Sequence, residues 1–328
     1  MAQQRIEFID LAKGVCILLV VMGHSGFPLD TPGWNYVRMP LYFMLSGLFF
    51  KDYGGWWQFI IKKTNKILIP FLFFYLVGNV CFYLIKYTKP ELLITDAKGI
   101  WDMFNNRQFF NGPIWFLLAL YWCNVFFCGI TLHVKKEIYQ FYIVCLLGFI
   151  GWFMGYKGWF VPLYIDVALT SMPFFTMGYF LKKTNILYPN KYDKYNLLLF
   201  ATFWGISLII EKAAHIRLSL HINTIEGWAT YLLSFTSVMS VLYLCKSIKH
   251  IPFITYIGRY SIILLCVHHL IYRPLMVIVR PFNWGDFGDC AIAVLTILLS
   301  ALCIPFFKKY LPWFVAQKDI IKIKEGNQ

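Results

Sequence analysis

Residues 8–27 read FIDLAKGVCILLVVMGHSGF and form one mostly apolar stretch. A stretch of about 20 apolar residues predicts a helix that crosses a membrane. This one also carries Asp10 and Lys13 near its start and His24 near its end. Ionisable residues inside a membrane-spanning helix are costly, so they mark a candidate functional site. The rest of the sequence has to show whether these three residues belong to one.

The composition indicates a membrane protein. Of the 328 residues, 59% are hydrophobic and 14% are charged, whereas an ordinary soluble domain is about 25% charged. The net charge of +14 would point to nucleic acid in a soluble protein. In a membrane protein, Lys and Arg collect in short cytoplasmic loops instead. We therefore expect membrane lipid, and no nucleic acid, as a partner.

Apolar runs of spanning length recur along the chain. They are continuously apolar and do not alternate, which favours helices over barrel strands. We predict an all-α polytopic fold of about ten transmembrane helices, in a single membrane-embedded domain over 1–328 with a short cytoplasmic tail after about 310. The expected spans are 8–27, 36–50, 65–86, 113–132, 138–155, 160–181, 195–211, 224–245, 256–279 and 287–310.

The distribution of cations predicts the orientation. With the N-terminus in the cytoplasm, 20 of the 30 Lys and Arg residues fall on the inner side, so the positive-inside rule places both termini there. The first span lacks a clear cleavage site and is expected to remain in the mature protein. The nine cysteines show no CxxC and no zinc spacing. They are expected to pack as small apolar residues, and no metal is expected.

The polar residues of the first span fall into an ordered pattern. Lys13 and His24 are eleven residues apart, so both lie on one helix face, separated by about 16 Å along the axis. Asp10 and Lys13 are three residues apart and can neutralise each other. This face therefore carries a cation near the cytoplasmic surface and an imidazole in the outer half.

The ninth span contains two further histidines. In IGRYSIILLCVHHLIYRP, His268 and His269 follow Arg259 by nine and ten residues. The helical rise places them about 15 Å from the cytoplasmic side, at a depth comparable to that of His24. Adjacent residues point about 100° apart, so one of the two is expected to face the interior of the bundle.

Four more features are candidates with open alternatives. Lys62, Lys63 and Lys66, in a predicted loop KKTNKILIP at the cytoplasmic face, can bind phosphates as point charges or simply lie beside anionic lipid. Asp166 is either a site residue or a polar packing residue. Trp115 is either a site wall or an interface anchor. Ser46, in FMLSGLFF, is a further polar candidate.

Six segments in this order resemble the acyltransferase-3 family of membrane acyltransferases: FIDLAKGVCILLVVMGH, RMPLYFMLSGLFF, KKTNKILIPF, GPIWFLLALY, SMPFFTMGYFLKK and IGRYSIILLCVHHLI. The resemblance implies a ten-helix fold that takes an acyl group, usually acetyl, from cytoplasmic acyl-CoA. It also implies delivery to a hydroxyl of a sugar or glycan on the extracytoplasmic side of a bacterial cytoplasmic membrane. Lys13 and His24 match one family signature, and Lys63 with Lys66 match a second. Both have Lys where Arg is usual, which keeps the charge and loses the bidentate fork.

On this resemblance we expect an acetyl-CoA-dependent O-acetyltransferase that modifies a cell-envelope polysaccharide or a lipid-linked saccharide. His24 would be the general base, assisted by His268 or His269, with Lys13, Lys63 and Lys66 at the CoA phosphates. An acyl-His24 intermediate, a succinyl donor and an inactive family member remain open. The main alternative is a transporter or flippase in which the buried ionisable residues form a proton or substrate path. Trp101, Phe109 and Phe110, in an outer loop near 87–112, are either candidates for stacking on sugar rings or part of the aromatic belt at the membrane interface.

Overall fold

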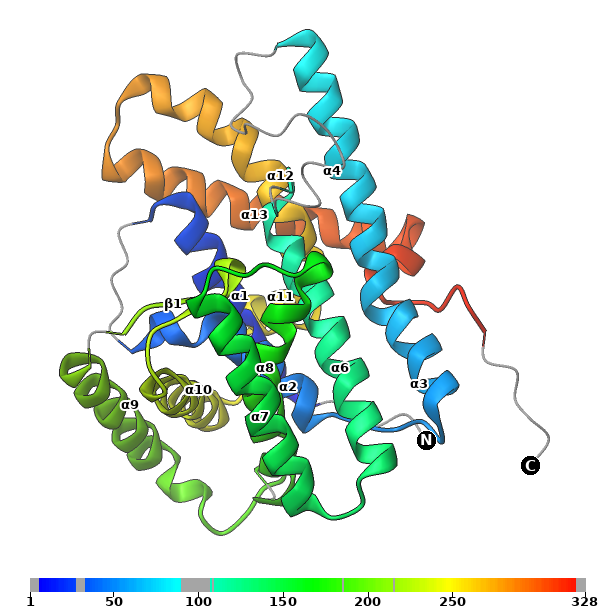
Figure 1. Cartoon of the computed structure of the whole chain (residues 1–328). Helices are drawn as coiled ribbons and strands as arrows, with labels where there is room; N and C mark the ends of the chain where they lie inside the picture. Colours follow the sequence, from blue (N-terminus) through cyan, green and yellow to red (C-terminus); the bar gives the residue numbers. More distant parts are fainter. Residues whose placement is uncertain are drawn as a thin grey trace.

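The computed structural model describes residues 6–27, 33–89, 107, 109–184, 186–214 and 216–322. The described chain is almost entirely helical (Figure 1), as expected where hydrocarbon offers no partner to unpaired backbone groups. Its helices are α1 (Glu7–Ser25), α2 (Arg38–Leu48), α3 (Trp56–Lys63), α4 (Ile69–Thr88), α6 (Trp115–His133), α7 (Glu137–Tyr156), α8 (Ile165–Leu181), α9 (Asn196–Ala213), α10 (Ala229–Ile248), α11 (Pro252–Arg259), α12 (Ser261–Val279) and α13 (Asp286–Tyr310).

Every predicted span contains a helix. Eight helical segments of the described chain are long and apolar enough to cross a membrane, so the protein is a multi-pass membrane protein. The other two predicted spans contain shorter helices, which are α2, with 11 residues, and α8, with 17. The residues of the predicted outer loop from 90 to 106, Trp101 among them, lie outside the described part.

Two boundary predictions were wrong. The predicted loop KKTNKILIP is helical, because α3, a π-helical turn over Thr64–Leu68 and α4 run on without a break. The predicted ninth span is two helices, because the chain leaves helical geometry at Tyr260, between α11 and α12. Phe109 and Phe110 are also buried rather than exposed, at 5% and 7% exposure, so they are not free to stack on a sugar.

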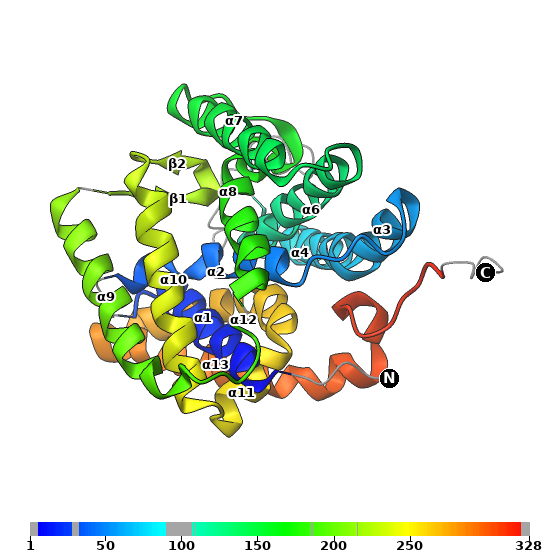
Figure 2. The ribbon, with the colours of Figure 1, turned by 90° about the horizontal axis from the view of Figure 1, so that it is seen from below.

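The core surrounds α8, which packs on α2, α6, α7 and α10. Viewed from below, α8, α1 and α2 occupy the middle of the bundle, and α9 lies at its edge (Figure 2). The α2–α8 contact is especially close, because a Cβ at Gly47 would lie 1.8 Å from the carbonyl oxygen of Phe175. Only glycine permits this approach of two backbones.

One small hairpin interrupts the helices. Strands β1 (Leu218–Ser219) and β2 (Thr224–Ile225) pair antiparallel, with Leu218 opposite Ile225. The 3₁₀ turn Leu220–Ile222 connects them and carries His221. After α13, the chain continues through a 3₁₀ turn (Pro312–Val315) to residue 322. We call residues 312–322 the tail.

Candidate active site

Three histidines from two helices meet in one cluster. The ring centroid of His24, at the end of α1, lies 5.5 Å from that of His268 and 5.5 Å from that of His269, both on α12. His268 and His269 are 0% and 9% exposed, whereas His24 is exposed. The expectation that only one of the adjacent histidines faces inward was therefore wrong. Both lie against His24, and His24 is the accessible member.

Hydrogen bonds fix the tautomers of the two buried histidines. His268 Nδ1 lies 2.8 Å from the carbonyl oxygen of Leu264, which only accepts, so Nδ1 carries the proton. His269 Nδ1 instead accepts a hydrogen bond from the backbone N–H of Gly112 at 3.3 Å. Neutral His269 therefore carries its proton on Nε2. In the cluster, His268 therefore presents a lone pair at Nε2, and His269 presents an N–H donor at Nε2.

Arg38 is a candidate site residue that the sequence reasoning missed. It begins α2, and a Cβ built on Gly23 would lie 2.4 Å from its Nη1. The guanidinium therefore packs on α1 one residue before His24. Its Nη2 donates to Asn35 Oδ1 at 3.2 Å, which holds the planar group in place. The sequence contains a signal for this residue, the Arg of RMPLYF, but we counted it only as a charge of an outer loop.

A second group of side chains is connected to the cluster through Gly112, which donates to His269 three residues before Trp115. Trp115 is buried and stacks on Tyr164 with ring centroids 5.6 Å apart. The Tyr164 hydroxyl lies 3.3 Å from His221 Nε2. His221 lies outside the spanning helices. Burial is the main cause that lowers its pKa below 6.5, and the positive charge of Arg107 lowers it further. His221 is therefore neutral at pH 7 and can accept or donate a hydrogen bond.

Asp166 has structural partners in this second group. Its carboxylate forms a buried ion pair with Arg107, and Asn223 Nδ2 donates to Asp166 Oδ2 at 3.1 Å. Leu163 and Tyr164, just before α8, both have left-handed backbones, with φ of 64° and 59°. Such residues cost energy, and the surrounding structure must hold them. The ion pair anchors this turn and therefore the ring of Tyr164.

The predicted cationic residues are divided by the fold. Lys13 Nζ lies 3.5 Å from Asp10 Oδ1, which confirms the predicted pair. Lys63 lies over the ring of Phe59. Lys66 turns to the tail, where it contacts Asp319 at 2.9 Å. Among the described residues, Lys63 and Lys66 therefore contact different partners.

The tail is held against the end of α3 and the π-helical turn that precedes α4. Asn65 is 1% exposed and accepts hydrogen bonds from the N–H groups of Ile320 and Ile321, both at 2.9 Å. Its Nδ2 donates to the carbonyl oxygen of Ile321 at 2.8 Å. Lys62 contacts Asp319 at 2.8 Å. Sequence reasoning missed Asn65 because its partners lie more than 250 positions away.

Ser46 lies away from the histidines. It hydrogen-bonds Asn124, which donates from Nδ2 to Ser46 Oγ at 3.1 Å. Eight residues of α2 separate it from Arg38, which is about 12 Å along the axis. Within the described residues, no group of three or more His, Cys, Asp or Glu side chains is arranged to hold a metal ion.

An accessible imidazole backed by two buried ones, inside a bundle of membrane helices, is an arrangement suited to proton-transfer chemistry. The family model described as an acyltransferase domain, Acyl_transf_3, matches residues 6–307. The chain therefore belongs to the acyltransferase-3 family and is a membrane acyltransferase. This membership favours acyl transfer over the transport alternative. No curated protein and no solved structure gave a match.

Proposed function

We propose that the protein transfers a short acyl group, acetyl in the first instance, from cytoplasmic acyl-CoA to a hydroxyl of a cell-surface glycan or its lipid-linked precursor. We also propose that the protein lies in a bacterial cytoplasmic membrane, with both of its termini on the cytoplasmic side. The observation that carries it is the histidine cluster, in which exposed His24 is supported by His268 and His269 at 5.5 Å. An alcohol must lose its proton to attack a thioester, and His24 is the base that an acceptor can reach.

The reaction follows in balanced steps. His24 takes the proton of the acceptor hydroxyl while the hydroxyl oxygen attacks the thioester carbonyl carbon. The carbonyl oxygen becomes an oxyanion, which preorganised donors stabilise. Arg38, which packs on Gly23, and the Nε2–H of His269, whose ring centroid lies 5.5 Å from that of His24, are the candidate donors. The C–S bond then breaks, and the CoA thiolate takes the proton from His24.

The two buried histidines have different roles in this proposal. Nε2 of His268 is buried and has no hydrogen-bond partner among the described residues. It can accept the Nε2–H or Nδ1–H of His24 and so orient the ring, as the third group of a catalytic triad orients its base. His269 offers a proton instead of a lone pair, so it is the donor toward the oxyanion.

The donor would enter from the side of Lys13 and Lys63. Lys13 is partly exposed beside Asp10. Lys63 lies over the ring of Phe59, whereas Lys66 contacts the tail. Ammonium groups bind phosphates as point charges. We therefore assign Lys13 and Lys63 to the CoA phosphates. Lys66 would join them only after leaving its contacts with the tail.

The test is acetyl-CoA turnover by purified protein in nanodiscs, with a panel of glycan and lipid-linked acceptors. His24→Ala should lower acyl transfer by about 10²- to 10⁴-fold, the usual contribution of a general base. His250→Ala is the matched control, because His250 is half-exposed and pairs with Glu7 instead of the cluster. Wild-type transfer by the folded His24→Ala protein would refute the assignment.

A further inference from the structure

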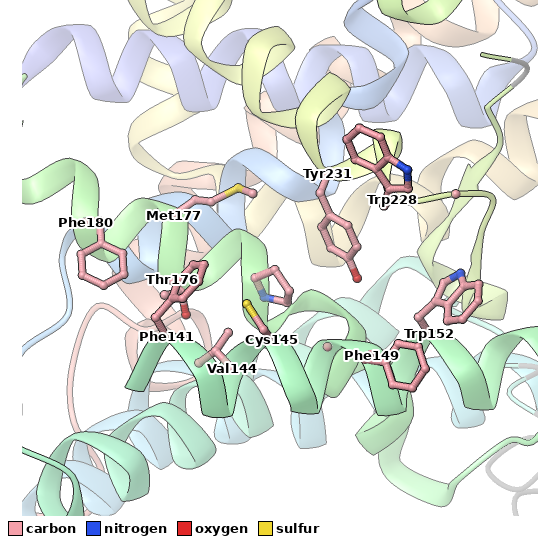
Figure 3. A pocket seen from close by; sticks show the side chains of 13 residues that line it. Phe141, Val144, Cys145, Phe149, Trp152, Thr176, Met177, Phe180, Trp228 and Tyr231 are labelled. Carbon is pink, nitrogen blue, oxygen red and sulfur yellow. The ribbon is translucent and has the colours of Figure 1, made fainter. Parts of the chain in front are cut away.

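A groove is lined by α7, by α8 and by the start of α10 (Figure 3). Its cavity volume is about 570 Å³, within the roughly 300–1,000 Å³ of small-molecule sites. Figure 3 shows Phe141 and Phe180 at one end and Trp152 and Trp228 at the other, with Tyr231 between. The walls are therefore mostly apolar, which suits a hydrocarbon ligand. We call this cavity the chain groove.

Local packing explains why the groove stays open. At Gly148, α7 lies so close to α8 that a Cβ would come within 2.7 Å of the Pro173 ring. Along the same helix, Phe141 and Phe149 turn outward and are 45% and 58% exposed. The two helices thus touch along a narrow line, and the aromatic side chains stand beside that line as a rim.

The groove opens toward lipid. Both α7 and α10 are apolar enough to span a membrane, so hydrocarbon is the medium outside the rim. Phe141 and Trp152 are eleven residues apart on α7, which is about 16 Å, or about half of a 30 Å bilayer core. Trp152 and Trp228 mark one end, and tryptophan favours the level of the lipid headgroups. A chain in the groove would therefore have its headgroup at that end.

A series of contacts connects the tryptophan end of the groove with the second group of the candidate active site. Trp152 Nε1 donates to the carbonyl oxygen of Ile225, in β2, at 3.0 Å. Trp228 follows directly after this hairpin, and the same hairpin carries His221 on its turn. The hydroxyl of Tyr164 then links His221 to Trp115 through the stacked rings. One hairpin thus contacts Trp152 at the end of the groove and carries His221 of the second group.

We propose that the chain groove binds the single hydrocarbon chain of a lipid-linked saccharide, so that the saccharide headgroup lies over the hairpin, toward His24. The inference rests on the proposed acyl transfer and narrows its acceptor from glycans in general to one attached to an isoprenoid-type chain. The saccharide of such a lipid would lie at the Trp152 and Trp228 end of the groove, beside the hairpin that carries His221. A two-chain phospholipid is the comparator in the test.

The first experiment measures binding without catalysis. The probe is a diazirine derivative of farnesyl phosphate, photolysed with the protein in nanodiscs, with a diazirine phosphatidylcholine as comparator. Cys145 lines the groove and is exposed, so Cys145→Trp should fill it and cut farnesyl labelling of α7 and α10 by about tenfold. Leu146→Trp is the matched control, because Leu146 is 59% exposed on the same helix and is not part of the lining.

The second experiment measures turnover with one sugar offered either as its methyl glycoside or linked to farnesyl phosphate. Cys145→Trp should lower kcat/KM roughly tenfold for the farnesyl-linked acceptor and leave the methyl glycoside unchanged. Cys145→Phe, a smaller change, serves if the Trp variant does not fold. Equal farnesyl labelling in the Cys145 and Leu146 variants, or equal labelling by both photoprobes, would overturn the groove assignment. Wild type that acylates neither acceptor would contradict the proposed function instead, while the labelling result still decides the groove.

Discussion

Asn65, more than Asp319, should hold the tail on the bundle. Asn65 is buried, and three of its hydrogen bonds reach Ile320 and Ile321. A net contribution of about 1 kcal/mol for each bond gives roughly 3 kcal/mol, which is about a hundredfold in the docking equilibrium. Asp319 forms two ion pairs, but its side chain and those of both lysines are 29–33% exposed. Exposed pairs contribute about 0–1 kcal/mol each.

The assay is hydrogen exchange at the amides of Ile320 and Ile321 in nanodiscs. Asn65→Ala should accelerate exchange by about a hundredfold at low and high salt, and Asp319→Asn by tenfold or less. Added salt should screen only the contribution of Asp319. Asn79→Ala is the control, because Asn79 donates within α4, to Tyr75, and does not touch the tail. A larger effect from Asp319→Asn than from Asn65→Ala would refute the reasoning.

The same tail has an expected pH dependence. Burial raises the pKa of the Asp319 carboxyl, but hydrogen bonds from Lys62 and Lys66 outweigh burial and lower the pKa below 3.8. Because the folded-state pKa is depressed, the pair stabilises docking fully above pH 3.8 and loses that contribution as the pH falls through the lower value. Proteolytic release of the tail should therefore be flat near neutral pH and rise only in acid.

Three further predictions concern the second group and the core. Asp166→Asn leaves Arg107 buried without its counter-charge and should cost about 3–5 kcal/mol; thermal unfolding in detergent measures it, and a loss under about 1 kcal/mol would contradict the buried pair. Arg107→Gln should raise the pKa of His221 toward 6.5 by removing the neighbouring charge; an NMR titration showing no rise would exclude that charge as a cause. Gly47→Ala or Gly178→Ala forces a Cβ to within 1.8 Å of a backbone oxygen and should cost about 3 kcal/mol or more; an unchanged melting temperature would count against the close α2–α8 contact.

The depth of the site could be predicted from the sequence because helical rise is nearly constant. The spacing of Lys13 from His24, and of Arg259 from His268, placed the imidazoles at one level before any packing was known. Which helices are neighbours is a tertiary property, and periodicity does not report it. The sequence therefore placed His268 and His269 correctly in depth but not in orientation. Both rings reach His24 because α12 packs directly on α1.

Contacts between distant segments escaped prediction for the same reason. His221 lies on a short turn without periodicity, and Asn65 reads as one polar residue among lysines. Each gains a partner only when the hairpin or the tail folds back. The π-helical turn at Thr64–Leu68 adds a local rotation that separates Lys63 from Lys66. An ideal helix would have placed these two residues, three apart, on neighbouring positions of one face.

The irregular helices explain how a charged site forms inside this bundle. A regular spanning helix of about 20 residues would have left Arg38 at the membrane surface, far from His24. Because α2 has only 11 residues, about 16 Å, its first residue lies beside the end of α1. The guanidinium then needs polar partners at that depth, and Asn35, in the turn just before α2, supplies one. The short length of α2 is therefore what places the guanidinium of Arg38 beside His24, the proposed base.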